Sequence, residues 1–339
     1  VMKYSKERRN SRKFELLEQI GRGAYSVVWR GRRRSKTTPE SEDVSSEQRI
    51  AVKEMFMRNV PSKRVERVLS EIAAMKILHG SSNIVEMYDA EEHRGSILLA
   101  MQLCDGGTLR EFIHKEAPMT DKDRLLDVVR QITSGLCALR KNDLVHRDLK
   151  PSNILIDRGK LLLADFGMSR SMRDSDTDSH VCGTIRYMAP EMLTQDVYGP
   201  SVDLWSLGCI VQELTTGKHP FLERDTENTC ETVSTAMAAL LSSIIQCRGP
   251  GNVTEVKVPT SVPFHMMIGS DSPVRIVQGL LQEYPKLRWT YQKLFGIMKL
   301  NGEPETPGTP ESPESPQSPE SPETPETSET SETQASHQM

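Results

Sequence analysis

Two short motifs near the middle of the chain constrain its fold more than any other feature of the sequence. Residues 145–153 read Val-His-Arg-Asp-Leu-Lys-Pro-Ser-Asn, and the triplet Asp165-Phe166-Gly167 begins twelve residues after Asn153. Together they supply a carboxylate that can accept a proton, a cation, and two side chains with oxygen atoms for a hard metal ion. A single Asp in a loop is usually a turn former, but this combination at this spacing is hard to produce by chance. We therefore expect the two motifs to meet in one site.

The pattern H-R-D-L-K-x-x-N followed by D-F-G resembles the catalytic segment of the eukaryotic protein kinase family, and the resemblance runs from about residue 14 to 297. It implies that Asp148 is the catalytic base and that Lys150 stabilises charge on the transferring group. It also implies that Asn153 and Asp165 hold Mg²⁺ and that ATP is the phosphoryl donor. Lys150 is typical of Ser/Thr kinases, so we expect a serine/threonine protein kinase. The alternatives are a pseudokinase scaffold of the same fold and a dual-specificity or tyrosine kinase.

Apolar patterns along the chain predict mainly strands first and helices later. The expected strands are 14–20, 27–30, 50–53 and 96–103, and the expected helices are 62–78, 125–136 and 202–214. The fold class is thus α+β, a two-lobed arrangement with a small β-rich N-lobe containing one key helix and a larger, mostly helical C-lobe. The expected boundaries are 14–101 for the N-lobe, 102–107 for the hinge and 108–297 for the C-lobe. A cleft between two lobes is a usual place for a ligand.

A glycine-rich turn follows the first expected strand. Glycine lets backbone N–H groups approach phosphate oxygens, and the kinase pattern G-x-G-x-x-G-x-V covers the phosphates of ATP. Ser26 replaces the third Gly of that pattern, and the chain continues as a strand rather than as the helix found in dinucleotide-binding folds. The residues of this turn and its flanks that we expect to bind ATP are Ile20, Gly21, Arg22, Gly23, Ala24, Tyr25, Ser26, Val27 and Val28.

Ala51-Val52-Lys53 is similar to the strand that carries the family's phosphate-neutralising lysine. In isolation Lys53 would be an ordinary surface lysine, but it stands after the glycine-rich turn and ahead of a helix with a suitable acid. An ion pair with that acid would fix its ammonium over the phosphates. Glu71 is the expected partner. Glu66 is the rival, but it falls on the more polar side of the expected helix.

Residues 101–104 align with the family's interlobe hinge. Adenine recognition there uses main-chain groups, so we expect the carbonyl of Gln102 and the amide of Cys104 to meet the adenine edge. The side chains expected to sandwich the adenine faces are those of Val28, Ala51 and Leu155. Plain core packing is the alternative interpretation of these three, and both interpretations can hold together.

Three further residues are expected to support the site without taking part in its chemistry. By the same resemblance, Glu191 pairs with Arg288, and Asp203 braces the backbone of the catalytic loop.

Residues 205–210, Trp-Ser-Leu-Gly-Cys-Ile, and 241–250 are similar to segments of the cyclin-dependent and MAP kinases. This similarity indicates a role in signalling or cell-cycle control. That branch normally has Tyr-Arg-Ala-Pro-Glu, however, and this chain has Met188 in place of the Arg. The cyclin-binding motif P-S-T-A-I-R-E is also absent from the sequence.

The segment after the D-F-G triplet holds candidate regulatory phosphosites. In the family, basic residues in the positions of Arg147 and Arg170 receive a phosphate and order this segment. The candidates are Ser175, Thr177 and Ser179. In the alternative interpretation, Arg147 is already served by acidic residues of the same segment, namely Asp174, Asp176 and Asp178.

The two ends of the chain differ from its body in composition. Residues 301–339 hold nine Glu and no Lys, Arg or Asp, whereas the rest of the chain holds 43 basic and 38 acidic side chains. We expect 298–339 to be a disordered tail rich in Pro, Glu, Ser and Thr, because such a segment cannot bury enough apolar surface to offset its ordering entropy. Residues 1–13 are expected to form a basic N-terminal extension.

The six Cys residues are scattered without a pairing rhythm, and the sequence shows neither an apolar leader nor an apolar run long enough to span a membrane. We therefore expect an intracellular protein, cytoplasmic or nuclear or both. The expected partners are protein substrates, with an upstream activating kinase or a regulatory subunit. We expect no nucleic acid and no membrane among them.

Overall fold

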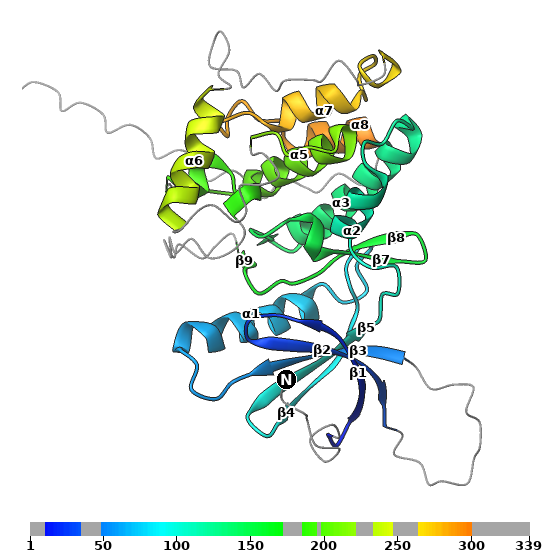
Figure 1. Cartoon of the computed structure of the whole chain (residues 1–339), viewed down its shortest axis with the longest axis vertical. Coiled ribbons are helices and arrows are strands. Elements are labelled where there is room, and N and C mark those ends of the chain that lie inside the picture. The colour runs from blue at the N-terminus through cyan, green and yellow to red at the C-terminus, as the bar shows by residue number, and fades with distance from the viewer. Residues whose placement is uncertain are drawn as a thin grey trace, which may run out of the picture. The chain divides into compact units, whose positions relative to one another are not determined.

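The N-terminal part of the protein is built on a five-stranded antiparallel sheet with the strand order β1-β2-β3-β5-β4 (Figure 1). The structure, a computed structural model, describes residues 11–34, 49–171, 185–194, 198–221, 233–246 and 264–299. The strands of this sheet are β1 Phe14–Arg22, β2 Ser26–Arg33, β3 Arg49–Phe56, β4 Met87–His93 and β5 Ser96–Gln102.

Alternation along β3 divides the packing between the two faces of the sheet. Ile50 and Val52 belong to a small apolar cluster on one face. Ala51 and Met55 belong to the large core cluster on the other face. Lys53 shares the face of Ala51 and Met55, so the strand directs its ammonium toward the side that carries the large core.

Helix α1, Ser62–Ile77, agrees with the predicted helix 62–78 and lies against the same face of the sheet (Figure 1). Its buried residues include Val68 and Met75, with Glu71 buried among them. A carboxylate buried on the apolar side of a helix needs a partner, and Lys53 supplies it. Strand β4 was not predicted, because its sequence Met-Tyr-Asp-Ala-Glu-Glu-His lacks apolar alternation.

The C-terminal part is mostly helical (Figure 1). Its α-helices are α2 Leu109–Glu116, α3 Lys122–Lys141, α4 Pro190–Leu193, α5 Ser201–Thr216, α6 Val233–Gln246, α7 Pro273–Leu280 and α8 Tyr291–Met298. Predicted helices 125–136 and 202–214 correspond to α3 and α5. Helix α5 is buried from Val202 to Thr215 on all sides, so it forms the centre of this lobe. The arrangement confirms the predicted α+β fold with a β-rich lobe and a helical lobe.

Short strands hold the two motifs of the opening paragraph next to each other. The strand β6, Leu144–Val145, pairs with β9, Arg170–Ser171, and thereby joins the start of one motif to the end of the other. The hairpin of β7, Ile154–Asp157, and β8, Lys160–Leu163, spans the interval between them. A 3-10 turn, Pro151–Asn153, completes the first motif. This local framework brings residues 145–153 and 165–167 into one site.

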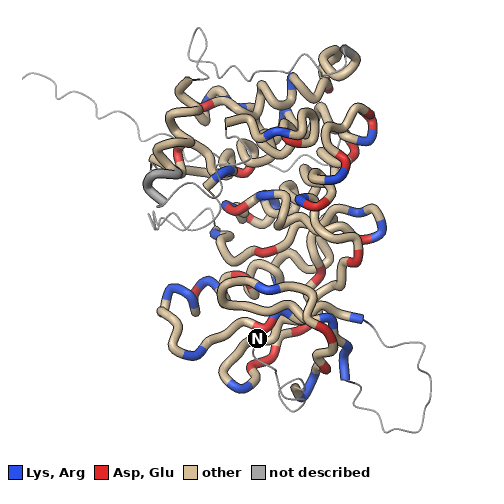
Figure 2. The backbone as a smooth tube through the Cα atoms, in the orientation of Figure 1, with Lys and Arg blue, Asp and Glu red and all other residues tan. Residues whose placement is uncertain are grey.

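Two further observations concern the surface and length of the elements. Basic residues gather in the first turns of α1, where Lys63, Arg64 and Arg67 occur (Figure 2). In the part of the chain that the structure describes, no helix combines the length and apolarity needed to cross a membrane.

Candidate active site

The ammonium of Lys53 connects the two lobes. Its Nζ donates to Oε1 of Glu71 on α1 at 2.6 Å and to Oδ1 of Asp165 at 3.1 Å. The side chains of Lys53 and Glu71 are 15% and 6% exposed, whereas that of Asp165 is 49% exposed. Glu66, the rival to Glu71, lies on the exposed side of α1. The site thus holds one cation between a buried carboxylate and a carboxylate that faces the cleft.

This arrangement shifts the protonation equilibria of its members. Burial by itself would lower the pKa of Lys53, but the nearby carboxylates of Glu71 and Asp165 outweigh it and raise that pKa above its usual value. Burial would raise the pKa of Asp165, but the charge of Lys53 and its hydrogen bond lower that pKa. At neutral pH the Lys53 ammonium and the Asp165 carboxylate are therefore both charged.

A second cluster surrounds the carboxylate of Asp148. Lys150 Nζ donates to Oδ2 of Asp148 at 2.7 Å, and Asn153 Nδ2 donates to the same oxygen at 3.1 Å. Asn153 Nδ2 also donates to the main-chain carbonyl of Asp148 at 2.9 Å. Within the described ranges no residue donates a hydrogen bond to Oδ1 of Asp148. The carboxylate is therefore fixed through one oxygen, and the other can receive an incoming hydroxyl.

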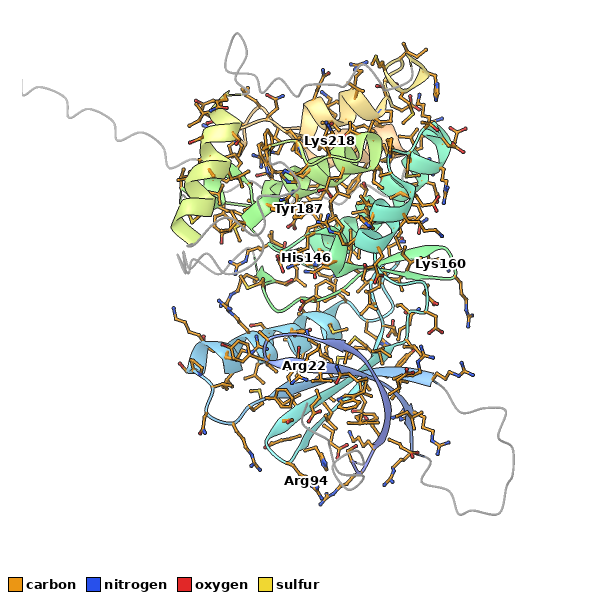
Figure 3. All side chains as sticks on the ribbon, in the orientation of Figure 1. Arg22, Arg94, His146, Lys160, Tyr187 and Lys218 are labelled. Atoms are coloured by element: carbon orange, nitrogen blue, oxygen red, sulfur yellow. The ribbon has the colours of Figure 1, made fainter. Side chains whose placement is uncertain are left out.

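The backbone that carries Asp148 is fixed by the fully buried Asp203 of α5. Its two carboxylate oxygens accept from the main-chain N–H groups of His146 at 2.8 Å and Arg147 at 2.9 Å, as predicted for Asp203. These bonds fix a turn in which Arg147 has a φ of 64°. Figure 3 labels His146 at the start of this loop. Asp203 belongs to the core of the C-lobe and stabilises this strained turn. The core therefore fixes the position of Asp148.

The D-F-G triplet is anchored by the burial of its central residue, Phe166. Phe166 is fully buried, and its ring centroid lies 5.2 Å from that of His146. A ring nitrogen of His146, Nε2, lies 3.2 Å from the carbonyl oxygen of Ala164. Asp165 itself has a φ of 62°, which turns its carboxylate out of the strand direction. Burial of the Phe thus anchors the triplet while leaving the Asp carboxylate at the cleft.

The oxygen donors fit the Mg²⁺ that the resemblance implies. Asn153 uses its amide nitrogen toward Asp148, which leaves its amide oxygen for a cation. Asp165 uses Oδ1 toward Lys53, and its second oxygen remains. Across the described residues there is no cluster of three or more His, Cys, Asp and Glu side chains of the kind that binds a metal by itself. Mg²⁺ normally takes one or two protein carboxylates together with substrate phosphates, so this sparse set suits it.

The residues predicted to bind ATP lie on β1, β2, β3, the hinge and β7. The segment 20–28 spans the end of β1 and the start of β2, and Figure 3 labels Arg22 in it. A Cβ atom on Gly23 would lie 2.9 Å from Oγ of Ser26, so a larger residue at position 23 would require the Ser26 side chain to move. Side chains expected to sandwich the adenine all pack on the large core cluster, namely Val28, Ala51 and Leu155.

At the hinge the side chain of Gln102 is engaged on the C-lobe, and that of Cys104 lies beside the main-chain carbonyl expected to meet adenine. Gln102 Nε2 donates to Oδ2 of Asp157 at 2.8 Å, so the amide of the side chain is engaged on the C-lobe. The Cys104 thiol lies near the Gln102 carbonyl, with Sγ 3.9 Å from the oxygen. Burial, followed by the charges of Asp157 and Asp105, raises the pKa of the Cys104 thiol to about 12. The thiol is therefore protonated at neutral pH and weakly nucleophilic.

Arg288 and Glu191 form the predicted buried pair. NH1 of Arg288 donates to Oε1 of Glu191 at 2.7 Å, and NH2 donates to Oε2 at 3.1 Å. The guanidinium also bonds main-chain carbonyls and lies 5.2 Å from the ring of Trp205 on α5. This fork-shaped contact ties the segment 185–194 to the end of the C-lobe.

Sequence reasoning missed a polar cluster beside this segment, in which Tyr187 and Glu213 are buried and Arg110 is partly exposed. Tyr187 OH donates to Oε2 of Glu213 at 2.8 Å, and Arg110 on α2 donates to the Tyr187 hydroxyl. The three residues come from three distant parts of the sequence, and no local motif joins them. The contacts attach the 3-10 turn Ile185–Tyr187 to α2 and α5.

The predicted phosphosites Ser175, Thr177 and Ser179 lie outside the described residues, as do Asp174, Asp176 and Asp178. Arg147, their expected partner, donates from Nε to the carbonyl of Met168 at 2.8 Å and from NH1 to the hydroxyl of Tyr198 at 3.3 Å. Burial lowers the pKa of Arg147, and the charges of Arg170 and Arg67 act in the same direction. Arg170 and Arg67 therefore both lie within electrostatic reach of Arg147.

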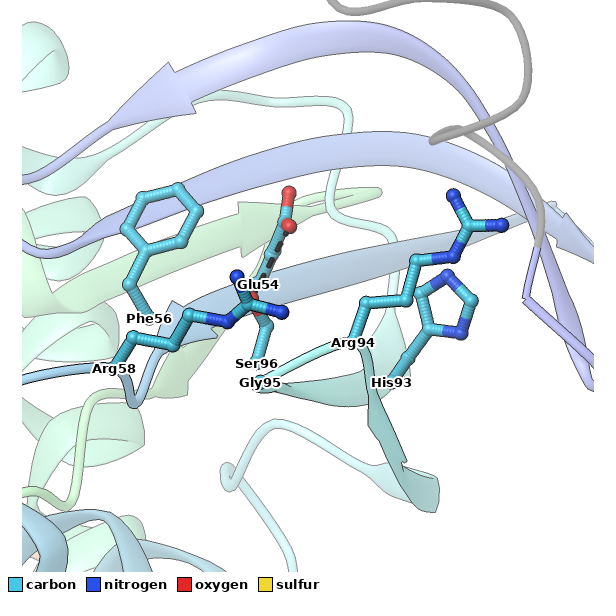
Figure 4. Close-up of a pocket in the computed structure, with 7 residues that line it drawn as sticks. All are labelled: Glu54, Phe56, Arg58, His93, Arg94, Gly95 and Ser96. Atoms are coloured by element: carbon cyan, nitrogen blue, oxygen red, sulfur yellow. Dashed lines mark hydrogen bonds between the residues drawn. The ribbon is translucent and has the colours of Figure 1, made fainter.

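A separate cavity of about 260 Å³ lies at the turn between β4 and β5 (Figure 4). Glu54 and Phe56 line it from β3, and these alternate with Lys53 and Met55, so the cavity opens on the other face of the sheet. The carboxylate of Glu54 is held by the indole N–H of Trp29 at 3.0 Å. The remaining lining residues are Arg58, His93, Arg94, Gly95 and Ser96. This cavity is therefore not part of the site around Lys53 and Asp148.

Comparison with known families identifies the arrangement. The family model for the protein kinase domain matches residues 14–297. The chain belongs to the protein kinase family. The predicted resemblance is confirmed, and the two-lobed architecture described above is that of a kinase domain.

Curated relatives of the kinase domain include serine/threonine-protein kinase ATG1b of Arabidopsis thaliana, which is 38% identical over 216 residues. Serine/threonine-protein kinase ULK1 of Homo sapiens is 34% identical over 218 residues, and serine/threonine-protein kinase unc-51 of Caenorhabditis elegans is 32% identical over 222 residues. The matches cover 61%, 61% and 62% of this chain, respectively, but only 28%, 20% and 25% of those relatives. The chain thus spans less than a third of the length of each.

These relatives correct one prediction. They give no support to the cyclin-dependent and MAP kinase branch or to a role in the cell cycle. The motif 205–210 that indicated that branch lies within the part of α5 that is buried on all sides. The burial of these residues means that packing in the centre of the C-lobe accounts for their sequence, so they do not identify a branch.

Proposed function

We propose that the chain is an active serine/threonine protein kinase that transfers the γ-phosphoryl group of ATP to Ser and Thr hydroxyls of protein substrates. The observation that carries this proposal is the pair of fixed clusters: Lys53 held between Glu71 and Asp165, and Asp148 held by Lys150 and Asn153. A binding scaffold has no need of a carboxylate fixed through one oxygen with the other oxygen directed to a substrate. The names of the relatives support the Ser/Thr assignment.

Each cluster has a distinct task in the proposed reaction. Asp148 orients the substrate hydroxyl and accepts its proton as the new bond forms, late because the transition state is loose. Lys150 is bonded to the same carboxylate and places a positive charge beside the oxygens of the transferring group. Lys53 neutralises the α- and β-phosphates, and Glu71 keeps its ammonium over them.

Asn153 and Asp165 are the residues that would hold Mg²⁺, which supplies charge neutralisation to the phosphates when bound. The loop 20–28 covers the phosphates, and Val28, Ala51 and Leu155 enclose the adenine. The main-chain carbonyl of Gln102 and amide of Cys104 read its edge. We further propose that residues 14–297 are the kinase domain, between a basic extension at 1–13 and a tail at 298–339.

The regulatory part of the proposal rests on the arginine cluster. Arg147 is near Arg170 and Arg67, and a phosphate on Ser175, Thr177 or Ser179 would offset their mutual repulsion and order the segment after the D-F-G triplet. An upstream kinase or a regulatory subunit would supply or stabilise that state.

The test is phosphoryl transfer from MgATP to an arrayed peptide library, comparing the native chain with Asp148→Asn and with Asp123→Asn as a matched control on the exposed start of α3. Transfer by the native chain and the control, but not by Asp148→Asn, supports the proposal. Phosphoamino-acid analysis of the products then separates a Ser/Thr kinase from a dual-specificity or tyrosine kinase. No transfer by the native chain, even after treatment with activating kinases, would support the pseudokinase alternative.

A further inference from the structure

The tip of the loop that covers the phosphates contacts helix α1 through one side-chain pair. The guanidinium carbon of Arg64 lies 4.9 Å from the ring centroid of Tyr25. A cation at this distance over an aromatic face is attracted by the negative face of the ring. Tyr25 is 55% exposed, so apolar burial does not explain the position of its ring.

Main-chain bonds hold Tyr25 where the stack can form. The carbonyl of Tyr25 accepts from the N–H of Phe56 at 3.2 Å, and the N–H of Gly23 donates to the carbonyl of Ser26 at 2.8 Å. These bonds fold the tip of the loop back onto the end of β3, directly before the short connection to α1. The ring is therefore presented to the first turn of that helix by the backbone itself.

Arg64 also lies near Glu71, the acid of α1 that pairs with Lys53. Seven residues make nearly two helical turns, so Arg64 and Glu71 lie on the same side of α1. The charge of Arg64 acts on the Glu71 carboxyl group. Arg64 Nε is buried, and within the described ranges it has no hydrogen-bond partner and no ion pair to a carboxylate. The contact found for this guanidinium among the described residues is the stack on Tyr25.

We propose that Tyr25 and Arg64 are positioning residues that hold the phosphate-covering loop against α1, so that the loop and the Lys53–Glu71 pair are placed together over the nucleotide. This inference rests on the proposed function, since it assigns these residues a role in binding the same nucleotide. It changes the expected role of Tyr25 from direct contact with ATP to a contact between the loop and the helix.

The stack holds the loop over the bound nucleotide to the same extent in the ground state and in the transition state. Loosening it therefore weakens nucleotide binding and raises KM for ATP, while kcat stays close to the native value. The attraction of an exposed cation–π pair corresponds to a change of about two- to fivefold. A purely structural role would instead lower the thermal stability and leave the affinity for nucleotide unchanged.

The experiment uses the full chain and four single substitutions, two at Tyr25 and two at Arg64. The double mutant combines Tyr25→Leu with Arg64→Met, and a fifth substitution serves as the control. Tyr25→Leu removes the aromatic face, and Arg64→Met removes the charge but keeps the length. Tyr25→Phe keeps the face and Arg64→Lys keeps a cation, so both should retain most of the native affinity. Lys76→Met, at the other end of α1, is the matched control. Steady-state kinetics give KM for ATP and kcat, and calorimetry gives the dissociation constant of ADP without requiring turnover.

The expected result is a two- to fivefold rise in KM for ATP and in Kd for ADP for Tyr25→Leu and for Arg64→Met, with no further rise in the double mutant. Equal ADP affinities in the native chain and both variants overturn the inference, whether or not the chain turns over. An additive double mutant also overturns it, because the two residues would then act independently. If the native chain binds no nucleotide, the proposed function and this inference fall together. Nucleotide binding without turnover overturns the proposed activity alone.

Discussion

The contact between Lys53 and Glu71 makes a quantitative prediction about catalysis. Glu71→Gln keeps the size of the side chain and can still accept a hydrogen bond from Lys53, but it removes the buried negative charge. The Lys53 ammonium then keeps Asp165 as its remaining carboxylate, at 3.1 Å. We expect it to move toward Asp165 and away from the position over the phosphates, so that transfer slows while the fold persists.

The size of the effect follows from the geometry. The bond from Nζ to Oε1 is 2.6 Å long and joins side chains that are 15% and 6% exposed, so solvent screens it little. A hydrogen bond between charged groups in such a setting contributes about 1.5–3 kcal/mol. Loss of that amount from transition-state stabilisation lowers kcat/KM by about 10- to 150-fold. The second carboxylate keeps the effect below that of an uncompensated buried charge.

The assay is steady-state phosphoryl transfer to the best peptide of the library, with the same measurement on Glu66→Gln. Glu66 lies five residues earlier on the same helix but faces solvent, so it controls for any general effect of losing an acid from α1. The control should retain native kcat/KM within about twofold, since an exposed charge contributes little. If Glu71→Gln is no slower than Glu66→Gln, the assignment of Glu71 as the partner that positions Lys53 is wrong.

Two further predictions concern stability. Glu191→Gln leaves the buried guanidinium of Arg288 without its counter-charge and should lower the free energy of unfolding by about 3 kcal/mol in urea denaturation, whereas Asp127→Asn in an exposed pair should change it by less than about 1 kcal/mol. Equal losses in both would contradict the buried-pair argument. His219 is kept neutral, because burial and then the charge of Arg186 lower its pKa to about 3. Between that value and 6.5 the unfolded chain binds a proton that the folded chain does not, so stability falls with decreasing pH, by about 2 kcal/mol from pH 7.5 to pH 5. His219→Gln should lose that part of the pH dependence, and an unchanged pH profile in the variant would refute it.

The sequence allowed prediction of those parts of the site whose chemistry and spacing are local. The pair Lys150 and Asn153 around Asp148 falls within six residues. Helix α1 was predicted within one residue because its apolar residues recur at helical spacing. The choice of Glu71 as the expected acid over Glu66 followed from the same periodicity, which places position 71 on the buried side.

Other parts were not predictable, since their signal is three-dimensional. Strand β4 has polar residues at most positions, and only its pairing with β5 makes it a strand. In the cluster of Arg110, Tyr187 and Glu213, the first two residues are 77 positions apart and the last two are 26 apart, so no short window of sequence contains it. A long-range polar contact depends on how helices and strands pack, and local propensity carries no information about it.

The stack of Tyr25 on Arg64 lies between these two cases. The spacing of Arg64 and Glu71 on one side of a helix could have been read from the sequence, since seven residues are nearly two turns. The position of the loop tip could not be predicted from the sequence, because it depends on the main-chain bond from Phe56 to Tyr25.

The contrast between local and long-range signals also explains why the branch prediction failed while the site residues could be named. The branch was inferred from residues 205–210, which serve packing in α5, and from residues 241–250, whereas Lys53, Asp148 and Asp165 were named for chemical groups that a kinase needs.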